Sequence, residues 1–334
     1  MKHQPSRGLT LASLTATLCI VGCGGTPSTK SADAPRAVDQ YVTGYQAYKR
    51  GETDYARQTL EAAVINNPDL RMARVVLGEI YREQNNYSAA AQQYEVLTRI
   101  DPYTLSNHYY LGVSYQFLSR FKESAIAYLK GLELDPEDFK SNMNLGTVYL
   151  ALGEVDEAVR YLDKATQLSP DSASAWSNLG VALDARNSLV LAETAYRKAM
   201  ERNPDSQTIM QNLANNLLAQ KKIGEAKILW EQIVAKSKTN FTLTKLGEAY
   251  TAAGEFDQAG KTLDSVLTRD PRYVPAINAK ASSMIRQYEL SGFADDKYRV
   301  AAVDLLQRSL ALNGGQTRVA DELKKWSNKT GLGQ

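Results

Sequence analysis

The sequence predicts an all-α protein, a right-handed α-solenoid of about eight helical hairpins followed by a C-terminal capping helix. Three series of residues with one shared period support this fold. Glycine or alanine recurs at a nearly constant interval, at Gly44, Gly78, Gly112, Gly146, Gly180, Ala214, Gly247 and Ala281. A proline follows most of these positions at one fixed offset, and a small residue follows them at a shorter one. Such self-similarity is typical of solenoid proteins, in which each unit packs only against its neighbours.

The first 36 residues differ in composition from the periodic part. Residues 1–7 are polar and positively charged, and residues 8–22 are apolar or small. The apolar run is shorter than the roughly 20 residues that span a bilayer, and its order is that of a secretory signal peptide. Its end, Ile20-Val21-Gly22-Cys23, resembles the lipobox of bacterial lipoproteins. We therefore interpret residues 1–22 as a lipoprotein signal peptide.

The lipobox resemblance implies that cleavage precedes Cys23 and that Cys23 carries the lipid and an acylated amine, a palmitate-type anchor. Several acyl chains are needed for stable anchoring, because one chain binds a membrane only marginally. Cys19 fits less well, since Leu18 would occupy the cleavage position that favours a small residue. Residues 23–36, small, polar and interrupted by proline, are predicted to form a lipidated flexible tether. The alternatives are an ordinary secreted protein and an uncleaved anchor.

Residues 37–316 resemble the tetratricopeptide repeat. In that family an apolar–glycine pair is followed by a tyrosine three residues later, then by an alanine and a closing proline. Leu145-Gly146 with Tyr149, and Leu111-Gly112 with Tyr115, follow this order. Small residues allow the two helices of a hairpin to approach closely, and proline ends the second helix. We count eight repeats.

Three segments depart from the pattern. The sixth repeat lacks its proline and is one residue short near residues 236–239, which predicts an irregular join. The last repeat carries about nine extra residues near Leu290–Tyr298 before its second helix. Residues 317–334 are interpreted as a capping helix and tail, because Val319, Leu323 and Trp326 recur at helical spacing.

The first helices of such repeats line the inner face of the solenoid in the family, and partners lie there. Asn144, Asn178 and Asn212 each lie two residues before the reference glycine or alanine, so three successive repeats share an amide at one inward position. An amide donates and accepts hydrogen bonds, which suits the backbone of an extended peptide. The row resembles the asparagine ladder of the O-linked N-acetylglucosamine transferases. The alternative is that these asparagines face water.

Tyrosines mark the first helices of the N-terminal half. Tyr41, Tyr45, Tyr109 and Tyr110 lie at or near inward positions and predict a tyrosine-lined binding groove. Tyrosine suits binding surfaces because its ring is rigid and its tip is polar. The alternative is that these rings fill space between helices, as expected of Tyr81 and Tyr115.

No catalytic motif is present. His108 is the only histidine after the signal peptide and occupies a repeat position often held by tryptophan, so we expect it to pack. Hence we predict no enzymatic activity, cofactor, metal site or small-molecule substrate. Charge is nearly balanced, with 39 Lys+Arg against 37 Asp+Glu, which argues against nucleic acid as a partner.

The expected function is that of a membrane-anchored adaptor that holds partner proteins or extended peptides on the inner face, outside the cytoplasm, in assembly of an envelope complex. Gly24 after Cys23 favours the outer membrane if the organism has one. The architecture resembles both pilotin or pilus-assembly lipoproteins and scaffolds of cell-wall hydrolases. The alternatives are a structural spacer of an envelope export machine and a non-catalytic regulatory subunit of a separate transferase or hydrolase.

Overall fold

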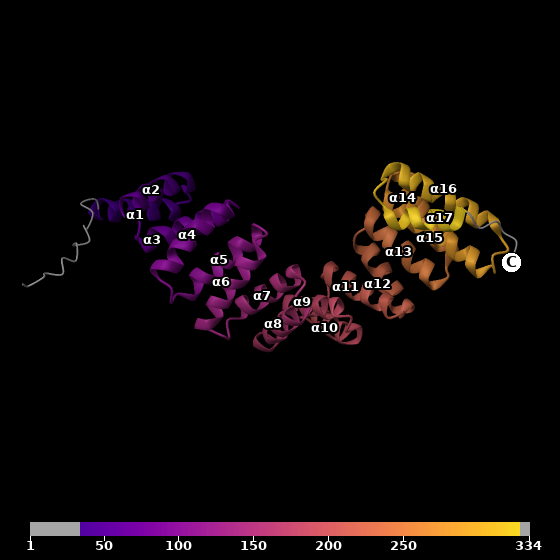
Figure 1. Ribbon diagram of the computed structural model, residues 1–334, viewed down its shortest axis with the longest axis horizontal. Coiled ribbons are helices and arrows are strands. Elements are labelled where there is room, and N and C mark those ends of the chain that lie inside the picture. The colour runs from indigo at the N-terminus through magenta and orange to yellow at the C-terminus, as the bar shows by residue number, and fades with distance from the viewer. Residues whose placement is uncertain (1–33, 328–334) are drawn as a thin grey trace, which may run out of the picture. The chain divides into compact units, whose positions relative to one another are not determined.

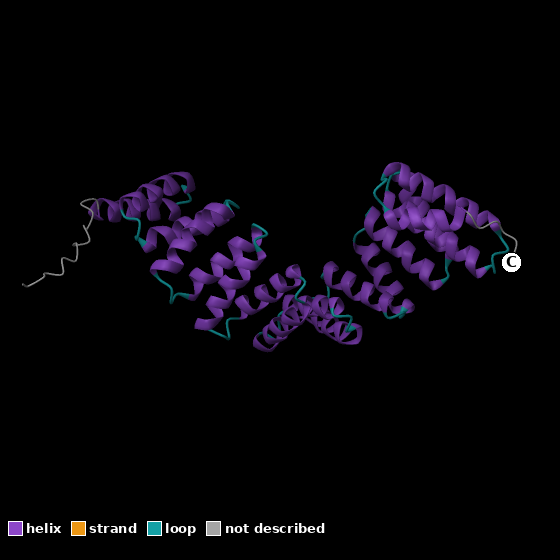
Figure 2. Ribbon diagram, viewed as in Figure 1, coloured by secondary structure: helices purple, strands orange, loops and turns teal. Residues whose placement is uncertain are grey.

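The computed structural model describes residues 34–327, and all regular structure within that range is α-helical (Figure 2). The predicted signal peptide, Cys23 and the final seven residues lie outside the described residues. In chain order the helices are α1 (Ala34–Lys49), α2 (Thr53–Asn66), α3 (Arg71–Glu83), α4 (Tyr87–Ile100), α5 (Leu105–Phe117), α6 (Phe121–Leu134), α7 (Phe139–Leu152), α8 (Val155–Leu168), α9 (Ala173–Ala185), α10 (Leu189–Arg202), α11 (Gln207–Ala219), α12 (Ile223–Lys236), α13 (Asn240–Ala253), α14 (Phe256–Arg269), α15 (Val274–Leu290), α16 (Asp296–Leu312) and α17 (Thr317–Ser327).

The chain forms two compact units, residues 1–73 and residues 74–334. In the first unit α1 and α2 pack against each other as a hairpin. In the second unit each helix from α4 onward packs against the next helix in the chain (Figure 1). Helix α1 includes the last three residues of the predicted tether, residues 34–36. Pro35 lies in its first turn, where the absent N–H leaves no helical hydrogen bond unmade.

The periodic glycines are the points at which the two helices of a hairpin meet. Gly112 faces Tyr128, Gly146 faces Leu162 and Gly180 faces Tyr196, always at the same separation along the chain. A Cβ added at these three glycines would lie 2.7, 2.5 and 2.5 Å from the facing side chain, closer than real Cβ contacts. The periodic glycine series therefore reflects one steric requirement repeated along the chain.

The turn inside each ordinary hairpin contains one residue in the left-handed backbone region, seven positions after the reference residue. Glycine occupies this position at Gly153 and Gly254, with φ of 78° and 76°. Ser119 and Lys221 occupy it in other repeats with φ of 59° and 61°. Side chains other than glycine, asparagine and aspartate rarely adopt this conformation.

A second periodic position ties each repeat to the one before it. His108, Asn142 and Trp176 are equivalent positions of three successive repeats, and a side-chain nitrogen of each donates to a proline carbonyl oxygen in the preceding turn. The distances to Pro102, Pro136 and Pro170 are 2.8, 3.1 and 2.8 Å respectively. His108 is 8% exposed, so it has the packing role that the sequence indicates.

The predicted irregular join between the sixth and seventh repeats is a short turn. Only residues 237–239 separate α12 from α13. The proline turn is replaced by a capping box, in which Thr239 Oγ1 accepts from the backbone N–H of Thr242 and Thr242 Oγ1 accepts from that of Thr239. The capping box thereby bonds two of the N–H groups at the start of α13 that have no partner within the helix. The missing residue leaves the flanking helices intact.

The extra residues of the last hairpin do not form a separate insertion. Helices α15 and α16 are each three or four residues longer than the helices from α3 to α14. Most of the added chain therefore lengthens both helices, and the turn between them covers residues 291–295. Phe293 in this turn packs edge-on against Tyr288, with ring centroids 5.3 Å apart.

Helix α17 covers the apolar end of the last hairpin. Its Trp326 is 2% exposed and packs edge-on against Tyr288 at 6.0 Å, and Arg299 Nη1 donates to its carbonyl oxygen at 3.0 Å. Val319 and Leu323 pack against the same cluster and remain partly exposed. Among the helices between residues 34 and 327, none combines the length and the apolar character needed to cross a bilayer.

Candidate functional site

The first helices of neighbouring repeats line one side of the second unit. Helix α5 contacts α7, α7 contacts α9, α9 contacts α11, and α13 contacts α15, whereas the second helices of neighbouring hairpins lie farther apart. We call the surface formed by the exposed side chains of these first helices the inner face. It contains Tyr109, Tyr110, Asn144, Asn178 and Asn212, the residues predicted for peptide binding in this unit.

Two of the three asparagines present unoccupied amides. Asn178 on α9 and Asn212 on α11 are half-buried, and neither has a hydrogen-bond partner among residues 34–327. Both side chains are therefore partly accessible, and their amides are not used within the protein. Because each amide offers donors and an acceptor, the pair matches the N–H and C=O groups of a peptide backbone.

Asn144 differs from the other two asparagines because the protein itself occupies its amide. Its Nδ2 donates to the hydroxyl oxygen of Tyr109 at 3.2 Å and to that of Tyr128 at 3.3 Å. Both amide hydrogens are thus used, and the side-chain oxygen remains as an acceptor. The predicted row is chemically uneven, with two open amides and one that is bonded internally.

Tyr109 and Tyr110 belong to a bonded aromatic cluster at the N-terminal end of the inner face. Tyr110 lies 5.1 Å from Tyr109 and 5.5 Å from Tyr94 between ring centroids, and the Arg82 guanidinium lies 3.9 Å above its ring. Burial raises the pKa of Tyr109 and raises that of Tyr94 to about 12. The hydroxyls of Tyr109 and Tyr94 are therefore neutral near pH 7.

Tyr41 and Tyr45 belong to the unit of residues 1–73. They stack on each other along α1, with ring centroids 5.9 Å apart and an interplanar angle of 22°. Tyr45 is 37% exposed, and the Lys49 ammonium lies 5.3 Å from its ring centroid. These rings are accessible, as the prediction of a tyrosine-lined groove requires, but they belong to a different unit from Tyr109 and Tyr110.

One set of inner-face residues was not identified from the sequence. Arg82, Gln116 and Asp184 each lie four residues after the reference glycine. Each bonds the tyrosine hydroxyl that reaches over that glycine from the second helix: Tyr94 at 3.5 Å, Tyr128 at 3.0 Å and Tyr196 at 2.9 Å.

Two of the repeats without such a tyrosine also lack this polar partner. Leu162 and Trp230 stand in the tyrosine position of their repeats, and the corresponding first-helix residues are Leu150 and Leu218. The two positions do not change together in every repeat, since Leu60 and Leu263 also face the reference glycine while the corresponding first-helix residues are Tyr48 and Thr251. The pair of positions is therefore only a partial signal in the sequence.

Metal-ligating side chains do not gather on the described part of the chain. Between residues 34 and 327, no three histidine, cysteine, aspartate or glutamate side chains come together in a way that would hold a metal ion.

Family models decide the class of the protein. Two models, both described as tetratricopeptide repeat, match residues 41–103, 109–173 and 143–207 in one case and residues 242–273 in the other. Together they cover more than half of the chain. The chain belongs to the tetratricopeptide repeat family. The predicted all-α repeat solenoid is thereby confirmed, and the fold is that of a scaffold for protein–protein interaction.

Solved structures share this fold at low sequence identity. The Cut9–Hcn1 hetero-tetramer of the APC/C contains a chain that is 15% identical, with a TM-score of 0.55 over 82% of this chain and 52% of that one. Pseudomonas aeruginosa PilF is 18% identical, with a TM-score of 0.51 over 63% of this chain and 96% of its own. No curated protein matches the sequence.

Proposed function

We propose that this protein is an adaptor that holds an extended segment of a partner protein on its inner face. The observation that carries the proposal is the pair of open amides at Asn178 and Asn212, which share one register position on the neighbouring helices α9 and α11. A ligand hydrogen bond that replaces the water at such a half-buried amide contributes about 1 kcal/mol net.

The spacing of the pair suits an extended chain. Packed helices lie about 8–10 Å apart, and an extended peptide rises about 3.3 Å per residue. Asn178 and Asn212 would therefore engage backbone groups about three residues apart. Asn144 continues the row with its side-chain oxygen, while the Tyr109 and Tyr128 hydroxyls hold its amide nitrogen. Backbone recognition of this kind depends little on the side chains of the bound segment.

Replacing the two open amides tests this function. We expect the double variant Asn178→Ala/Asn212→Ala to lose a partner that the wild-type protein retains in a crosslinked pull-down from membranes. Its melting temperature should not change, because neither amide bonds the protein itself. The matched control is Gln92→Ala/Gln258→Ala, which removes two exposed amides from the second helices α4 and α14. Equal retention of the partner by both variants would contradict binding at the inner face and favour a spacer or regulatory role.

The same protein is proposed to be a lipoprotein of the bacterial cell envelope. The support is the lipobox-like Ile20-Val21-Gly22-Cys23 behind a basic and then apolar start, followed by a proline-punctuated segment. A lipid on Cys23 would tether the repeats to an extracytoplasmic membrane surface, where they would assemble an envelope complex. Cys23 lies outside the described residues, so this proposal rests on sequence pattern and needs its own test.

Lipid attachment can be tested by substitution of the cysteine. We expect Cys23→Ala to abolish labelling with a radioactive fatty acid and to move the protein from the membrane fraction to the soluble fraction. Cys19→Ala is the control and should leave labelling unchanged. Labelling that persists in Cys23→Ala, or that disappears in Cys19→Ala, would rule out Cys23 as the acylated residue.

A further inference from the structure

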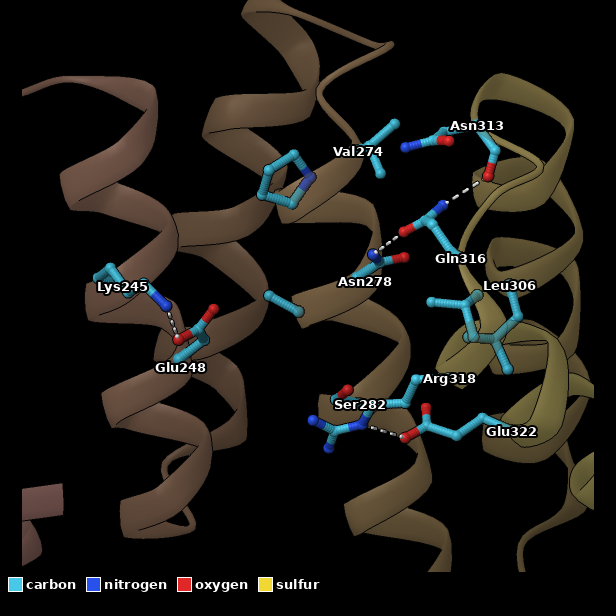
Figure 3. Close-up of a pocket in the computed structure, with 13 residues that line it drawn as sticks. Lys245, Glu248, Val274, Asn278, Ser282, Leu306, Asn313, Gln316, Arg318 and Glu322 are labelled. Carbon is cyan, nitrogen blue, oxygen red and sulfur yellow. Dashed lines mark hydrogen bonds and ion pairs between the residues drawn. The ribbon is translucent and has the colours of Figure 1, made fainter. Parts of the chain in front are cut away.

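A cleft lies at the C-terminal end of the second unit, between α13, α15 and the capping helix α17. Its first part has a volume of about 730 Å³ and is lined by Lys245 and Glu248 from α13 and by Arg318 and Glu322 from α17. Figure 3 shows these two pairs on opposite walls, with α15 between them. A second part of about 570 Å³ continues along α15, and the two parts share Glu248, Ala279 and Ser282. We call the whole the C-terminal cleft.

The floor of the C-terminal cleft allows another chain to approach closely. Ala279 and Ser282 on α15 are small, and the Ser282 hydroxyl has no partner among residues 34–327. Ala279 holds the register position that asparagine holds at Asn178 and Asn212, so the amide row does not extend into the cleft. The backbone of a bound peptide would therefore contact the surface of α15 directly here.

The amides at one end of the cleft are already satisfied. Asn278 Nδ2 donates to Gln316 Oε1 at 2.8 Å (Figure 3). Its side-chain oxygen accepts from the Ser309 hydroxyl at 2.6 Å. Gln316 in turn donates to Ser309 Oγ at 2.9 Å. This network fixes the start of α17 against α15 and leaves the charged residues and the Ser282 hydroxyl available to a ligand.

The charges of the C-terminal cleft are unequal. Its lining contains four basic residues and two acidic ones: Lys221, Lys245, Arg286, Arg318, Glu248 and Glu322. Lys245 is paired with Glu248 at 2.8 Å, and Arg318 lies 3.6 Å from Glu322. Lys221 has no partner among the described residues, and Arg286 meets only Glu289 at 3.8 Å on its own helix. The cleft thus has an excess of positive charge in a chain whose total is nearly balanced.

We propose that the C-terminal cleft is a second binding site, for an extended peptide segment that carries acidic side chains. The backbone of the segment lies over Ala279 and Ser282, and its carboxylates face Lys221, Arg286 and Arg318. Each of its two parts, of about 730 and 570 Å³, is within the range of about 300–1,000 Å³ common for ligand sites. This site is separate from the asparagine row, because it uses charge where the row uses neutral amides, and α17 supplies one of its walls.

Binding of matched peptides to the full purified chain tests the proposal. The probes are short fluorescein-labelled Gly-Ser peptides with four Glu, four Gln or four Lys residues at the same positions, followed by fluorescence anisotropy. We expect the Glu peptide to bind at least about tenfold more tightly than the Gln peptide at low salt. The preference should shrink as salt rises, since exposed charges are screened within about 10 Å at 0.1 M.

Two variants locate the site, one through charge and one through shape. The double variant Lys221→Glu/Arg286→Glu should remove the preference for the Glu peptide. The control is Lys238→Glu/Lys261→Glu, which changes the net charge by the same amount at exposed positions outside the cleft and should preserve the preference. Ser282→Trp should weaken binding by filling the cleft without changing charge. Thermal melting identifies any variant that fails to fold.

The outcomes separate this site from the proposed peptide-binding row. Asn178→Ala/Asn212→Ala should keep the full preference for the Glu peptide, whether or not the row binds a partner. Equal affinity for the Glu and Gln peptides would overturn the proposal. A preference that survives both Lys221→Glu/Arg286→Glu and Ser282→Trp would also overturn it.

Discussion

Gly180→Ala is expected to lower the free energy of unfolding by about 1 kcal/mol, although alanine is the better helix former. The added Cβ would lie 2.5 Å from the Tyr196 ring. That ring is 2% exposed, and its hydroxyl donates to Asp184 at 2.9 Å, so it is held at its outer end and cannot move aside. Overpacking of this kind costs about 1–3 kcal/mol, more than the gain of roughly 1 kcal/mol in helix propensity.

The matched control for Gly180→Ala is the same substitution at a helical glycine with open surroundings. A Cβ added at Gly260 in α14 would have no atom within 4 Å. Gly260→Ala should therefore raise the free energy of unfolding by up to about 1 kcal/mol. Urea unfolding followed by circular dichroism measures both variants. Effects of the same sign at the two glycines would contradict the close approach of α9 and α10.

Glu193 is the second position at which a large effect is expected. It is 8% exposed and accepts hydrogen bonds from Lys222 Nζ at 2.6 Å, Gln220 Nε2 at 2.7 Å and Arg197 Nη2 at 2.8 Å. Gln220 and Lys222 come from the turn of the next hairpin, so the carboxylate joins two repeats. Burial alone would raise the pKa of Glu193, but the bonds from Lys222, Arg197 and Gln220 outweigh it and lower the pKa.

Glu193→Gln should therefore destabilise the protein by about 2 kcal/mol at pH 7, because charge-assisted bonds contribute about 1.5–3 kcal/mol. A carboxylate whose pKa is lower in the folded state stabilises the protein above its unfolded pKa of about 4.3. That contribution is lost as the pH falls through the folded pKa. The difference in the free energy of unfolding between wild type and Glu193→Gln should consequently be largest at pH 7 and become smaller below about pH 4.

Urea unfolding at several pH values measures this deficit. Glu133→Gln provides the control, since Glu133 forms only an exposed pair with Lys130 at 2.9 Å and its loss should change stability by less than about 0.5 kcal/mol. A deficit for Glu193→Gln that stays constant from pH 7 to pH 3 would contradict the assignment of a bonded carboxylate.

The repeat fold was predictable because one steric requirement recurs at a fixed interval. The small residues at the helix crossing, the prolines after the second helices and the left-handed turn residues all follow the same period. Even the absence of a proline near residue 238 located a real change in the structure, the shortened turn before α13.

Whether an individual inner-face side chain is hydrogen-bonded within the protein was not predictable from the period alone. Asn144, Asn178 and Asn212 share one register position, yet only Asn144 has tyrosine hydroxyls within reach. That difference depends on which repeats carry Tyr109 on the first helix and Tyr128 on the second helix. Register places an asparagine on the face, and its neighbours decide whether its amide remains open.

The two charged walls of the C-terminal cleft could not be predicted for another reason. Helix α17 has no counterpart in the repeat pattern, so periodicity supplies no register from which to place Arg318 and Glu322 opposite Lys245 and Glu248. The extra residues of the last hairpin were located correctly along the chain. Their distribution into two longer helices could not be predicted, because the repeat pattern contains no other hairpin of that length.

Site-specific photo-crosslinking tests the inner-face account most directly. A benzoylphenylalanine is placed either at Val181 on the first helix α9 or at Ile228 on the second helix α12, residues that are 37% and 51% exposed. Both are branched apolar side chains at accessible positions, so they differ mainly in the face they occupy. The account predicts crosslinks to a partner protein from Val181 and none from Ile228. Crosslinks from Ile228 alone would contradict it.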